Sequence, residues 1–194
     1  MRSSYIENNY GKVFENLVYA FTPQICVELG VLDGYSTLHI AKGIDHVGKV
    51  LDHRSHLFSY DLFHDYPYKH SIEKDVELML EKNKVLQHVD LIHGDAYNAY
   101  KDFSDVSICL VHIDISNDGD VLKKMVELWY PKLTWGGMIV FEGGSEERDN
   151  VDWMVKYNKP KIKPELESNK LINSKFLYGT YNMFPSLTIL IKKQ

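Results

Sequence analysis

The sequence predicts an open α/β fold, with a mostly parallel sheet of seven strands, helices on both faces and a C-terminal antiparallel hairpin. Three observations predict it. Short apolar runs alternate with longer stretches of helical periodicity along most of the chain. The run at residues 106–113 is almost wholly apolar, which is typical of a parallel strand covered on both faces. The two last runs, 175–180 and 186–191, leave no room for a helix between them, so we expect them to pair antiparallel.

The elements follow in order along the chain. Apolar runs predict five parallel strands, at residues 25–29, 57–61, 89–93, 106–113 and 138–142. Helical spacing predicts helices around residues 37–42, 76–80 and 121–129. Gly136-Gly137 is expected to turn the chain into the fifth strand, and the prolines and lysines of residues 159–164 indicate an exposed connector. We expect a single domain over residues 1–194, with a helical segment (1–23), a cofactor-binding core (24–144) and a terminal hairpin (175–192).

The composition is that of an ordinary globular domain, with 194 residues, 44% hydrophobic and 25% charged. A formal net charge of -5 argues against a nucleic-acid partner held by bulk electrostatics. No apolar run is long enough to span a bilayer, and the first residues lack the apolar segment of a secretory signal. Cys26 and Cys109 lie inside apolar runs and are expected to be core thiols. We therefore expect a cytoplasmic protein without a membrane partner, and a homodimer is left open.

The first strand ends in the most informative stretch, Glu28 to Ser36. An acidic residue is followed by Gly30, which opens a tight turn, and by Gly34, where a helix should begin. In open α/β sheets, ligands bind beyond the carboxyl ends of the strands. The dinucleotide fingerprint is not met because position 32 is leucine, and no phosphate-loop pattern is present. A carboxylate at Glu28 would repel a pyrophosphate but attract an ammonium group. The alternative is a glycine turn that only links strand to helix.

The pattern E-x-G-x-x-x-G-x-S resembles the first motif of class I S-adenosylmethionine (SAM)-dependent methyltransferases, whose fold is Rossmann-like. The resemblance implies that Asp61, at the end of the second strand, accepts hydrogen bonds from the ribose hydroxyls. A helix N-cap is the alternative for Asp61. The resemblance also implies that Asp95, after the third strand, lies beside the adenine. The cofactor-binding residues implied in this way are Glu28, Leu29, Gly30, Val31, Gly34, Tyr35, Ser36, Asp61, Leu62, Gly94, Asp95, Ala96 and Asp114.

The fourth strand narrows the resemblance. His112-Ile113-Asp114, with Gly136-Gly137 before the next strand, is similar to the macrocin and cephalosporin O-methyltransferase branch, which has a catechol O-methyltransferase-like layout. The similarity covers about residues 25–144 and the terminal hairpin. It implies transfer of a methyl group to a hydroxyl of a small-molecule acceptor. It also implies a divalent cation, usually Mg²⁺, held by the strand-four and strand-five acids, here Asp114 and Glu142. Such a cation lowers the pKa of a substrate hydroxyl.

The chain departs from this branch at the acids. Ser116 stands for the second acid of strand four, and Gly143 stands for the second acid of strand five. Since hard cations need several oxygen ligands, the alternative is that Asp114 only contacts the methionine part of the cofactor. His112 would then orient a carboxylate or serve as a general base, or else it is a hydrogen-bonded core histidine. Asp114 and His112 are the predicted catalytic residues.

Other functions stay open at this point. A degenerate nucleotide-binding α/β protein is one alternative, which the missing second glycine disfavours. A non-catalytic protein that keeps the fold without the chemistry is another, and the changed acids at Ser116 and Gly143 raise it. An aminopropyl transferase is disfavoured because Glu28 is suited to an amino-acid head group. Sugars, phenols and small alcohols all remain candidate acceptors. The histidines around the second strand are expected to be surface or loop residues, namely His53, His56, His64 and His70.

Overall fold

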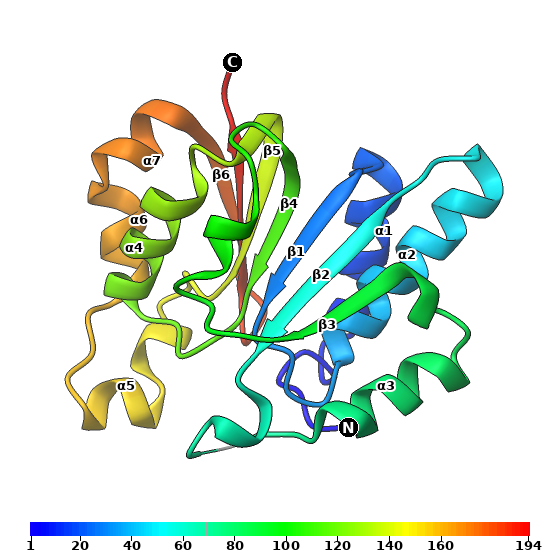
Figure 1. Cartoon of the computed structure of the whole chain (residues 1–194). Helices are drawn as coiled ribbons and strands as arrows, with labels where there is room; N and C mark the ends of the chain where they lie inside the picture. The colour runs from blue at the N-terminus through cyan, green and yellow to red at the C-terminus, as the bar shows by residue number, and fades with distance from the viewer. Residues whose placement is uncertain (69) are drawn as a thin grey trace. The chain divides into compact units, whose positions relative to one another are not determined.

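The computed structural model describes residues 1–68 and 70–194. It divides into two compact units, Met1–Ala99 and Tyr100–Gln194. The first unit contains three parallel strands, and the second contains two parallel strands and an antiparallel pair; Figure 1 labels most of them along the chain. The expectation of a single domain stays a prediction.

The first unit is built on three parallel strands. Strand β1 pairs with β2, and β2 pairs with β3, so that Leu29 lies beside Tyr60 and Asp61 lies beside His93. The predicted strand at residues 57–61 begins one residue earlier, and the other two strands have their predicted bounds. The elements of this unit are α1 (Tyr10–Phe21), β1 (Ile25–Leu29), α2 (Tyr35–Leu51), β2 (His56–Asp61), the 3₁₀ turns Phe63–Asp65 and Leu86–His88, α3 (Glu73–Lys82) and β3 (Val89–His93).

Helices α1 and α2 pack against each other closely because two glycines face side chains of the other helix. A Cβ on Gly43 would approach the Val18 side chain to 2.8 Å, and a Cβ on Gly11 would overlap the His39 ring. His39 Nδ1 lies 2.6 Å from Glu15 Oε1 at the same contact. This packing explains the helical character predicted for residues 1–23, and it fixes α2, which begins directly after the glycine turn.

The second unit combines a parallel and an antiparallel part. Strand β4 pairs parallel with β5, β5 pairs antiparallel with β7, and β7 pairs antiparallel with β6. The terminal antiparallel hairpin is therefore confirmed. The elements of this unit are β4 (Ile108–Ile113), α4 (Gly119–Trp129), β5 (Leu133–Glu142), the 3₁₀ turn Arg148–Asn150, α5 (Asp152–Lys156), α6 (Ile162–Ser168), α7 (Lys170–Lys175), β6 (Phe176–Tyr181) and β7 (Leu187–Lys192), and a 3₁₀ turn at Ala99–Asp102 precedes them.

The strand order is β3-β2-β1-β4-β5-β7-β6. Sequential strands that alternate with helices and a final reversed pair confirm the predicted fold class, a Rossmann-like and mostly parallel sheet of seven strands. Among the described residues, no helix combines the length and the apolar character that crossing a membrane would need.

The structure differs from the predicted turn at Gly136-Gly137 and from the predicted connector at residues 159–164. Strand β5 begins at Leu133, so the two glycines lie inside it, and the pairing shifts from Ile108 with Leu133 to Leu110 with Met138. Gly136 has a φ of 75° at this irregularity, which is typical of a bulge. The expected connector at residues 159–164 gives way to α6 at Ile162, while α5 and α7 were not predicted. Both cysteines are free thiols, Cys26 buried and Cys109 half-buried.

Candidate active site

The turn after β1 has the strained backbone that its glycines predict. Gly30 and Gly34 have φ values of 92° and 77°. The Gly30 N–H donates to the Tyr60 carbonyl at 2.9 Å, and the Gly34 N–H donates to the Val31 carbonyl at 2.8 Å. Leu32, at the position where a dinucleotide fingerprint has glycine, also has a positive φ, 48°. The turn is thus a tight, internally bonded structure at the carboxyl end of β1.

The carboxylate of Asp61 holds this turn from the neighbouring strand. Its Oδ2 accepts hydrogen bonds from the N–H groups of Val31 (2.7 Å) and Leu32 (3.1 Å). Its Oδ1 accepts one from the Phe63 N–H at 2.6 Å. Asp61 thus braces the turns that follow β1 and β2. The alternative of a helix N-cap does not hold, because the cap residue before the 3₁₀ turn Phe63–Asp65 is Leu62. Contact of Asp61 with ribose hydroxyls stays a prediction, and its Oδ1 can still accept one further hydrogen bond.

Glu28 is fully buried beneath the turn. Its Oε2 accepts hydrogen bonds from the hydroxyls of Thr37 (2.6 Å) and Ser59 (2.8 Å). These bonds connect β1 to the first turn of α2 and to β2, as a buried carboxylate requires. Direct contact of Glu28 with a cofactor ammonium stays a prediction.

The turn after β3 lies beside the turn after β2. The Gly94 N–H donates to the Asp61 carbonyl at 2.9 Å, and a Cβ on Gly94 would lie 3.2 Å from the Tyr60 ring. Asp95 is exposed, and its carboxylate accepts hydrogen bonds from the Tyr97 N–H (3.0 Å) and the Asn98 side chain (2.6 Å). The three acidic turns predicted from the sequence are therefore brought together at one edge of the first unit.

The remaining predicted cofactor residues of this unit differ in exposure. Leu29, Val31 and Ser36 are buried, while Leu62 and Ala96 are half-buried. Tyr35 is directed toward α1, where its hydroxyl accepts a hydrogen bond from the Gly11 N–H at 3.3 Å. The role of each in binding a cofactor stays a prediction.

An N-terminal arginine that sequence reasoning missed also holds the glycine turn. Arg2 Nη2 donates to Asp33 Oδ1 at 2.7 Å, to the His70 carbonyl at 2.9 Å and to Ser71 Oγ at 3.0 Å. The Ser71 hydroxyl donates to Asp33 as well. The side-chain hydrogen bond from Arg2 is the largest cause that holds the pKa of Asp33 well below its usual range, and the bond from Ser71 adds to it.

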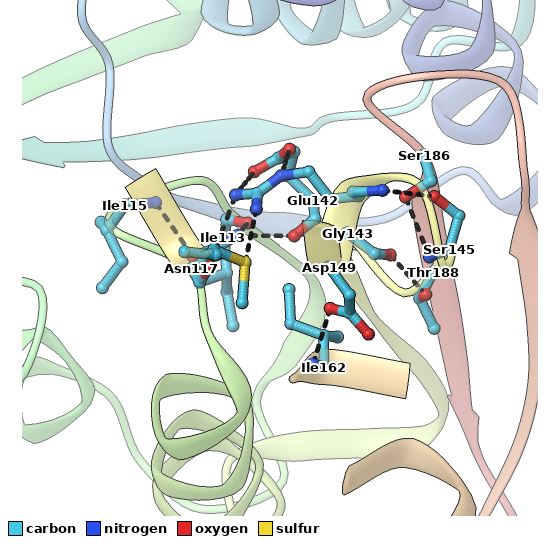
Figure 2. Close-up of polar contacts among 12 residues, drawn as sticks. Ile113, Ile115, Asn117, Glu142, Gly143, Ser145, Asp149, Ile162, Ser186 and Thr188 are labelled. Atoms are coloured by element: carbon cyan, nitrogen blue, oxygen red, sulfur yellow. Dashed lines mark hydrogen bonds and ion pairs between the residues drawn. The ribbon is translucent and has the colours of Figure 1, made fainter. Parts of the chain in front are cut away.

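In the second unit, Asp114 and Glu142 lie at the carboxyl ends of adjacent parallel strands. Ile113 of β4 pairs with Phe141 of β5, so the next residue on each strand is one of the two predicted acids. Asn117 ties these strand ends together, because its Nδ2 donates to the carbonyls of Ile113 and Glu142, both at 2.9 Å (Figure 2). Sequence reasoning did not single out Asn117. The structure shows that its side chain is fully buried.

Both carboxylate oxygens of Glu142 are engaged by a buried arginine. Arg148 Nε donates to Oε1 at 2.5 Å and Nη2 donates to Oε2 at 3.0 Å. The two side chains are each 6% exposed. Sequence reasoning expected exposed acids after Glu142 and missed Arg148. The one available signal is that Arg148 is the only basic residue between Lys132 and Lys156.

Burial raises the pKa of Glu142 to about 7, the nearby Asp114 carboxylate adds to the rise, and the Arg148 guanidinium opposes it. For Arg148, burial favours the neutral form, but Glu142 outweighs it and raises the pKa. The strand-end acids and the arginine therefore form one electrostatic group in which Arg148 stays charged.

The residues present do not fit a divalent cation at Glu142. Hard cations bind carboxylate oxygens directly, and here the guanidinium occupies that side of both oxygens. A 2+ ion about 4 Å from the guanidinium would be repelled by roughly 8 kcal/mol at an effective dielectric constant of about 20. Of the two predicted metal ligands, Glu142 is thus already paired with a cation, the Arg148 guanidinium, and Asp114 lies close to the pair.

His112 and the remaining acids of this region have clear positions. His112 is fully buried on β4, opposite Val140. Asp118 caps α4 through the Val121 N–H at 3.0 Å and lies 3.1 Å from Lys159 Nζ. The catalytic roles predicted for His112 and Asp114 stay predictions.

Elsewhere, one group of three side chains brings metal-ligating atoms together among the described residues, formed by the exposed His64, Asp65 and His93 of the first unit. His64 was expected at the surface and is exposed there. Its Nε2 lies 3.4 Å from Asp65, and His93 Nε2 lies 2.9 Å from the same carboxylate.

Several solved structures resemble the chain in fold. An O-methyltransferase from Bacillus cereus in complex with SAH has a TM-score of 0.71 at 15% identity, over 98% of this chain and 84% of that one. A SAH-bound methyltransferase from Podospora anserina has a TM-score of 0.69 at 17% identity, over 100% and 80%. The O-methyltransferase TomG from Streptomyces achromogenes, in complex with SAM, has a TM-score of 0.69 at 12% identity, over 96% and 80%. At such low sequence identities, these TM-scores show a shared fold alone.

The comparison with curated protein sequences finds no match. A family model described as a methyltransferase domain matches residues 27–142, which is more than half of the chain. The matched segment begins just before Glu28 and ends at Glu142, so it contains the glycine turn, the three acidic strand ends of the first unit and both strand ends of the second. The chain belongs to this methyltransferase domain family.

Proposed function

We propose that the protein is a SAM-dependent O-methyltransferase that methylates a hydroxyl of a small molecule. The observation that carries the proposal is the brace formed by Asp61, whose carboxylate holds the N–H groups of Val31 and Leu32. The brace joins the turns after β1 and β2 into one rigid edge, where ligands of parallel α/β sheets bind. The solved structures of similar fold in complex with SAM or SAH support the same cofactor.

The chemistry of the turns fits SAM better than a dinucleotide. SAM presents an ammonium group and two ribose hydroxyls, which need acceptors, whereas a pyrophosphate needs donors and positive charge. The strand-end turns of the first unit, residues 28–36, 61–62 and 94–96, carry acids and no lysine or arginine. Asp61 would hold the ribose, and Asp95 would lie beside the adenine. The methionine part would lie against the backbone of Gly30, which has no side chain.

SAM supplies a methyl group on a positively charged sulfur, and the protein contributes binding and alignment. Asp114 is half-exposed, so its carboxylate can accept a hydrogen bond from the acceptor hydroxyl and orient its oxygen. As the O–CH3 bond forms and the S–CH3 bond breaks to leave SAH, the same carboxylate would take the hydroxyl proton. Alignment of this kind supplies much of the rate in a displacement reaction. His112 lies two residues earlier and is fully buried, so we assign it a positioning role for Asp114.

Calorimetry with SAM, SAH and NAD tests the cofactor assignment. We expect micromolar-range binding of SAM and SAH, no binding of NAD, and loss of SAM binding in Gly30→Val, because a side chain would fill the ligand's space. Asp90→Asn is the matched control, since Asp90 is an exposed acid whose ion pair with His56 lies at the amino ends of β2 and β3, away from the carboxyl ends that carry the turns. Tight NAD binding without SAM binding would support the nucleotide-binding alternative instead.

The acceptor is tested with methyl-labelled SAM and a panel of phenols, sugars and small alcohols. We expect label transfer to a hydroxyl oxygen and its loss in Asp114→Asn, measured at saturating SAM because Asp114 is also a predicted cofactor-binding residue. SAM binding without transfer to any acceptor would indicate a protein that retains the fold and the cofactor but not the chemistry. The proposal includes a cytoplasmic location. Light scattering of the purified chain tests whether it forms a homodimer.

A further inference from the structure

The guanidinium of Arg148 is held on several sides by groups of the second unit. Besides its two hydrogen bonds to Glu142, it donates from Nη2 to the Asn117 carbonyl at 3.4 Å and from Nη1 to the Met154 sulfur at 3.0 Å. Its central carbon lies 5.3 Å from the centre of the Trp153 ring. These contacts leave the arginine one position, with its charge directed at the carboxylate that ends β5.

The backbone next to Glu142 also leaves no room for a second acid. Gly143 has a φ of 118°, which side chains rarely adopt, and a Cβ there would overlap the Ile162 side chain. Its N–H donates to the Ser186 carbonyl at 3.0 Å, and its carbonyl accepts from the Thr188 hydroxyl at 2.7 Å (Figure 2). The loss of an oxygen ligand at this position is therefore built into the packing.

The segment that carries Arg148 is fixed by separate contacts. The Arg148 N–H donates to the Ser145 hydroxyl at 3.2 Å. The neighbouring Asp149 is buried, and its carboxylate accepts hydrogen bonds from the N–H groups of Ile162 (2.7 Å) and Lys163 (2.9 Å) at the start of α6. The arginine is thus delivered to Glu142 by a rigid turn, and its position does not depend on the ion pair alone.

We infer that Arg148 takes the place of the divalent cation at the strand ends of this methyltransferase, so that Glu142 binds a guanidinium rather than a metal ion. The inference rests on the proposed function for its meaning in the reaction. It assigns Arg148 a positioning role, because the side chain is buried and acts through Glu142 and through the backbone carbonyl of Asn117. Methyl transfer then proceeds without added metal.

The substitution also restricts how an acceptor can bind. A metal ion with open coordination positions chelates two adjacent oxygens of a substrate, and a guanidinium whose N–H groups are already committed does not. We therefore expect acceptors with a single hydroxyl to be methylated as readily as those with adjacent hydroxyls. A marked preference for the chelating acceptors would contradict the inference.

Direct titration of Mn²⁺ onto the purified protein, followed by electron paramagnetic resonance, tests the inference without any acceptor. The wild type should bind no Mn²⁺ that Glu142→Gln removes, a criterion that separates the strand-end site from the exposed group of His64, Asp65 and His93. Arg148→Met keeps the apolar stem but frees both carboxylate oxygens of Glu142, and should bind Mn²⁺ there at least tenfold more tightly than the wild type. Arg148→Lys keeps a positive charge and should exclude Mn²⁺ like the wild type. Glu142→Gln in the Arg148→Met background should abolish the gained site.

The outcomes separate this inference from the proposed function. One equivalent of Mn²⁺ bound by the wild type and lost in Glu142→Gln would overturn the arginine assignment, whether or not Arg148→Met folds. Failure of SAM to bind in calorimetry would overturn the proposed function and leave the Mn²⁺ result readable. With an acceptor in hand, turnover should be unchanged by chelator, and a chelator-induced loss that Mg²⁺ restores would also overturn the assignment.

Discussion

The Asp61 carboxylate at the end of β2 accepts a hydrogen bond from the backbone N–H of Val31, 2.7 Å away in the turn after β1. One side chain thereby fixes the spacing of two strand-end turns. An acid in this position has two roles at once, because the same carboxylate that shapes the turn is predicted to bind ribose hydroxyls. Substitutions must therefore be assessed by affinity and stability together.

Asp61→Ala should weaken SAM binding by roughly 1.5–3 kcal/mol, or about 10- to 150-fold, because hydrogen bonds to a charged acceptor are lost. It should also lower the free energy of unfolding, because three backbone N–H groups lose their partner. Calorimetry and urea denaturation measure the two effects, with Asp90→Asn as the surface control. Unchanged affinity in a destabilised variant would show that Asp61 is a structural brace only.

Gly34→Ala should destabilise the first unit by about 1–3 kcal/mol and weaken SAM binding. Its φ is 77°, and a Cβ would approach Met79 Cε and Val76 Cγ1 to 2.8 Å each. Gly136→Ala is the matched comparison, since Gly136 has a φ of 75° and nothing lies within 4 Å of a Cβ there. Denaturation of both variants separates backbone strain from crowding. Equal losses in the two variants would show that crowding by α3 contributes nothing.

The strand ends of the first unit were predictable because each consists of local signals. Glycine, an acid and the end of an apolar run stand next to one another in the sequence, and parallel pairing brings such ends to one edge. The bulge in β5 was not predictable in this way. Gly136-Gly137 indicates a turn, and only pairing with β4 shows that the strand continues through it.

The Arg148–Glu142 pair could not be read from the sequence for a different reason. An arginine after two glutamates in a polar stretch indicates an exposed turn. Its burial depends on Met154 and on α6, whose first residue, Ile162, lies 14 positions after Arg148 in the numbering. The departures from the family pattern at Ser116 and Gly143 were visible, but the group that compensates for them was not.

Asn117→Ala should lower the free energy of unfolding by about 1–3 kcal/mol for each of the two carbonyls that lose a donor. Asn117 Nδ2 donates to Ile113 and to Glu142, so its loss releases the ends of β4 and β5 from each other. Urea denaturation measures the effect. Asn173→Ala is the control, because that side chain is exposed and donates to one carbonyl only, that of Glu167 in the neighbouring helix α6. A loss no larger than that of the control would contradict the proposed tie.

Arg2→Ala should make the free energy of unfolding depend less on pH in acid, because the pKa of Asp33 in the folded state would return toward its ordinary value. The Arg2 hydrogen bond is the main cause of the lowered pKa of Asp33 in the folded state. A carboxyl whose folded pKa is depressed adds stability that is complete above its unfolded pKa, about 3.9, and that is lost as the pH falls toward the folded value. The wild type should therefore exceed Arg2→Ala in stability at pH 7, and the gap should begin to narrow below about pH 4 and keep narrowing as the pH falls toward the folded pKa.

Urea denaturation at several pH values between 7 and about 2 measures this gap. Asp33→Asn removes the same ion pair from the other side and should show the same pH dependence as Arg2→Ala, while the double variant should lose little more than either single one. Lys12→Ala, which removes an exposed ion pair with Glu15, controls for general charge effects. Asp33 lies within the glycine turn, directly before Gly34, so Arg2→Ala should also weaken SAM binding at pH 7. A gap that stays constant from pH 7 down to pH 2 would show that Arg2 acts through packing and not through the Asp33 carboxylate.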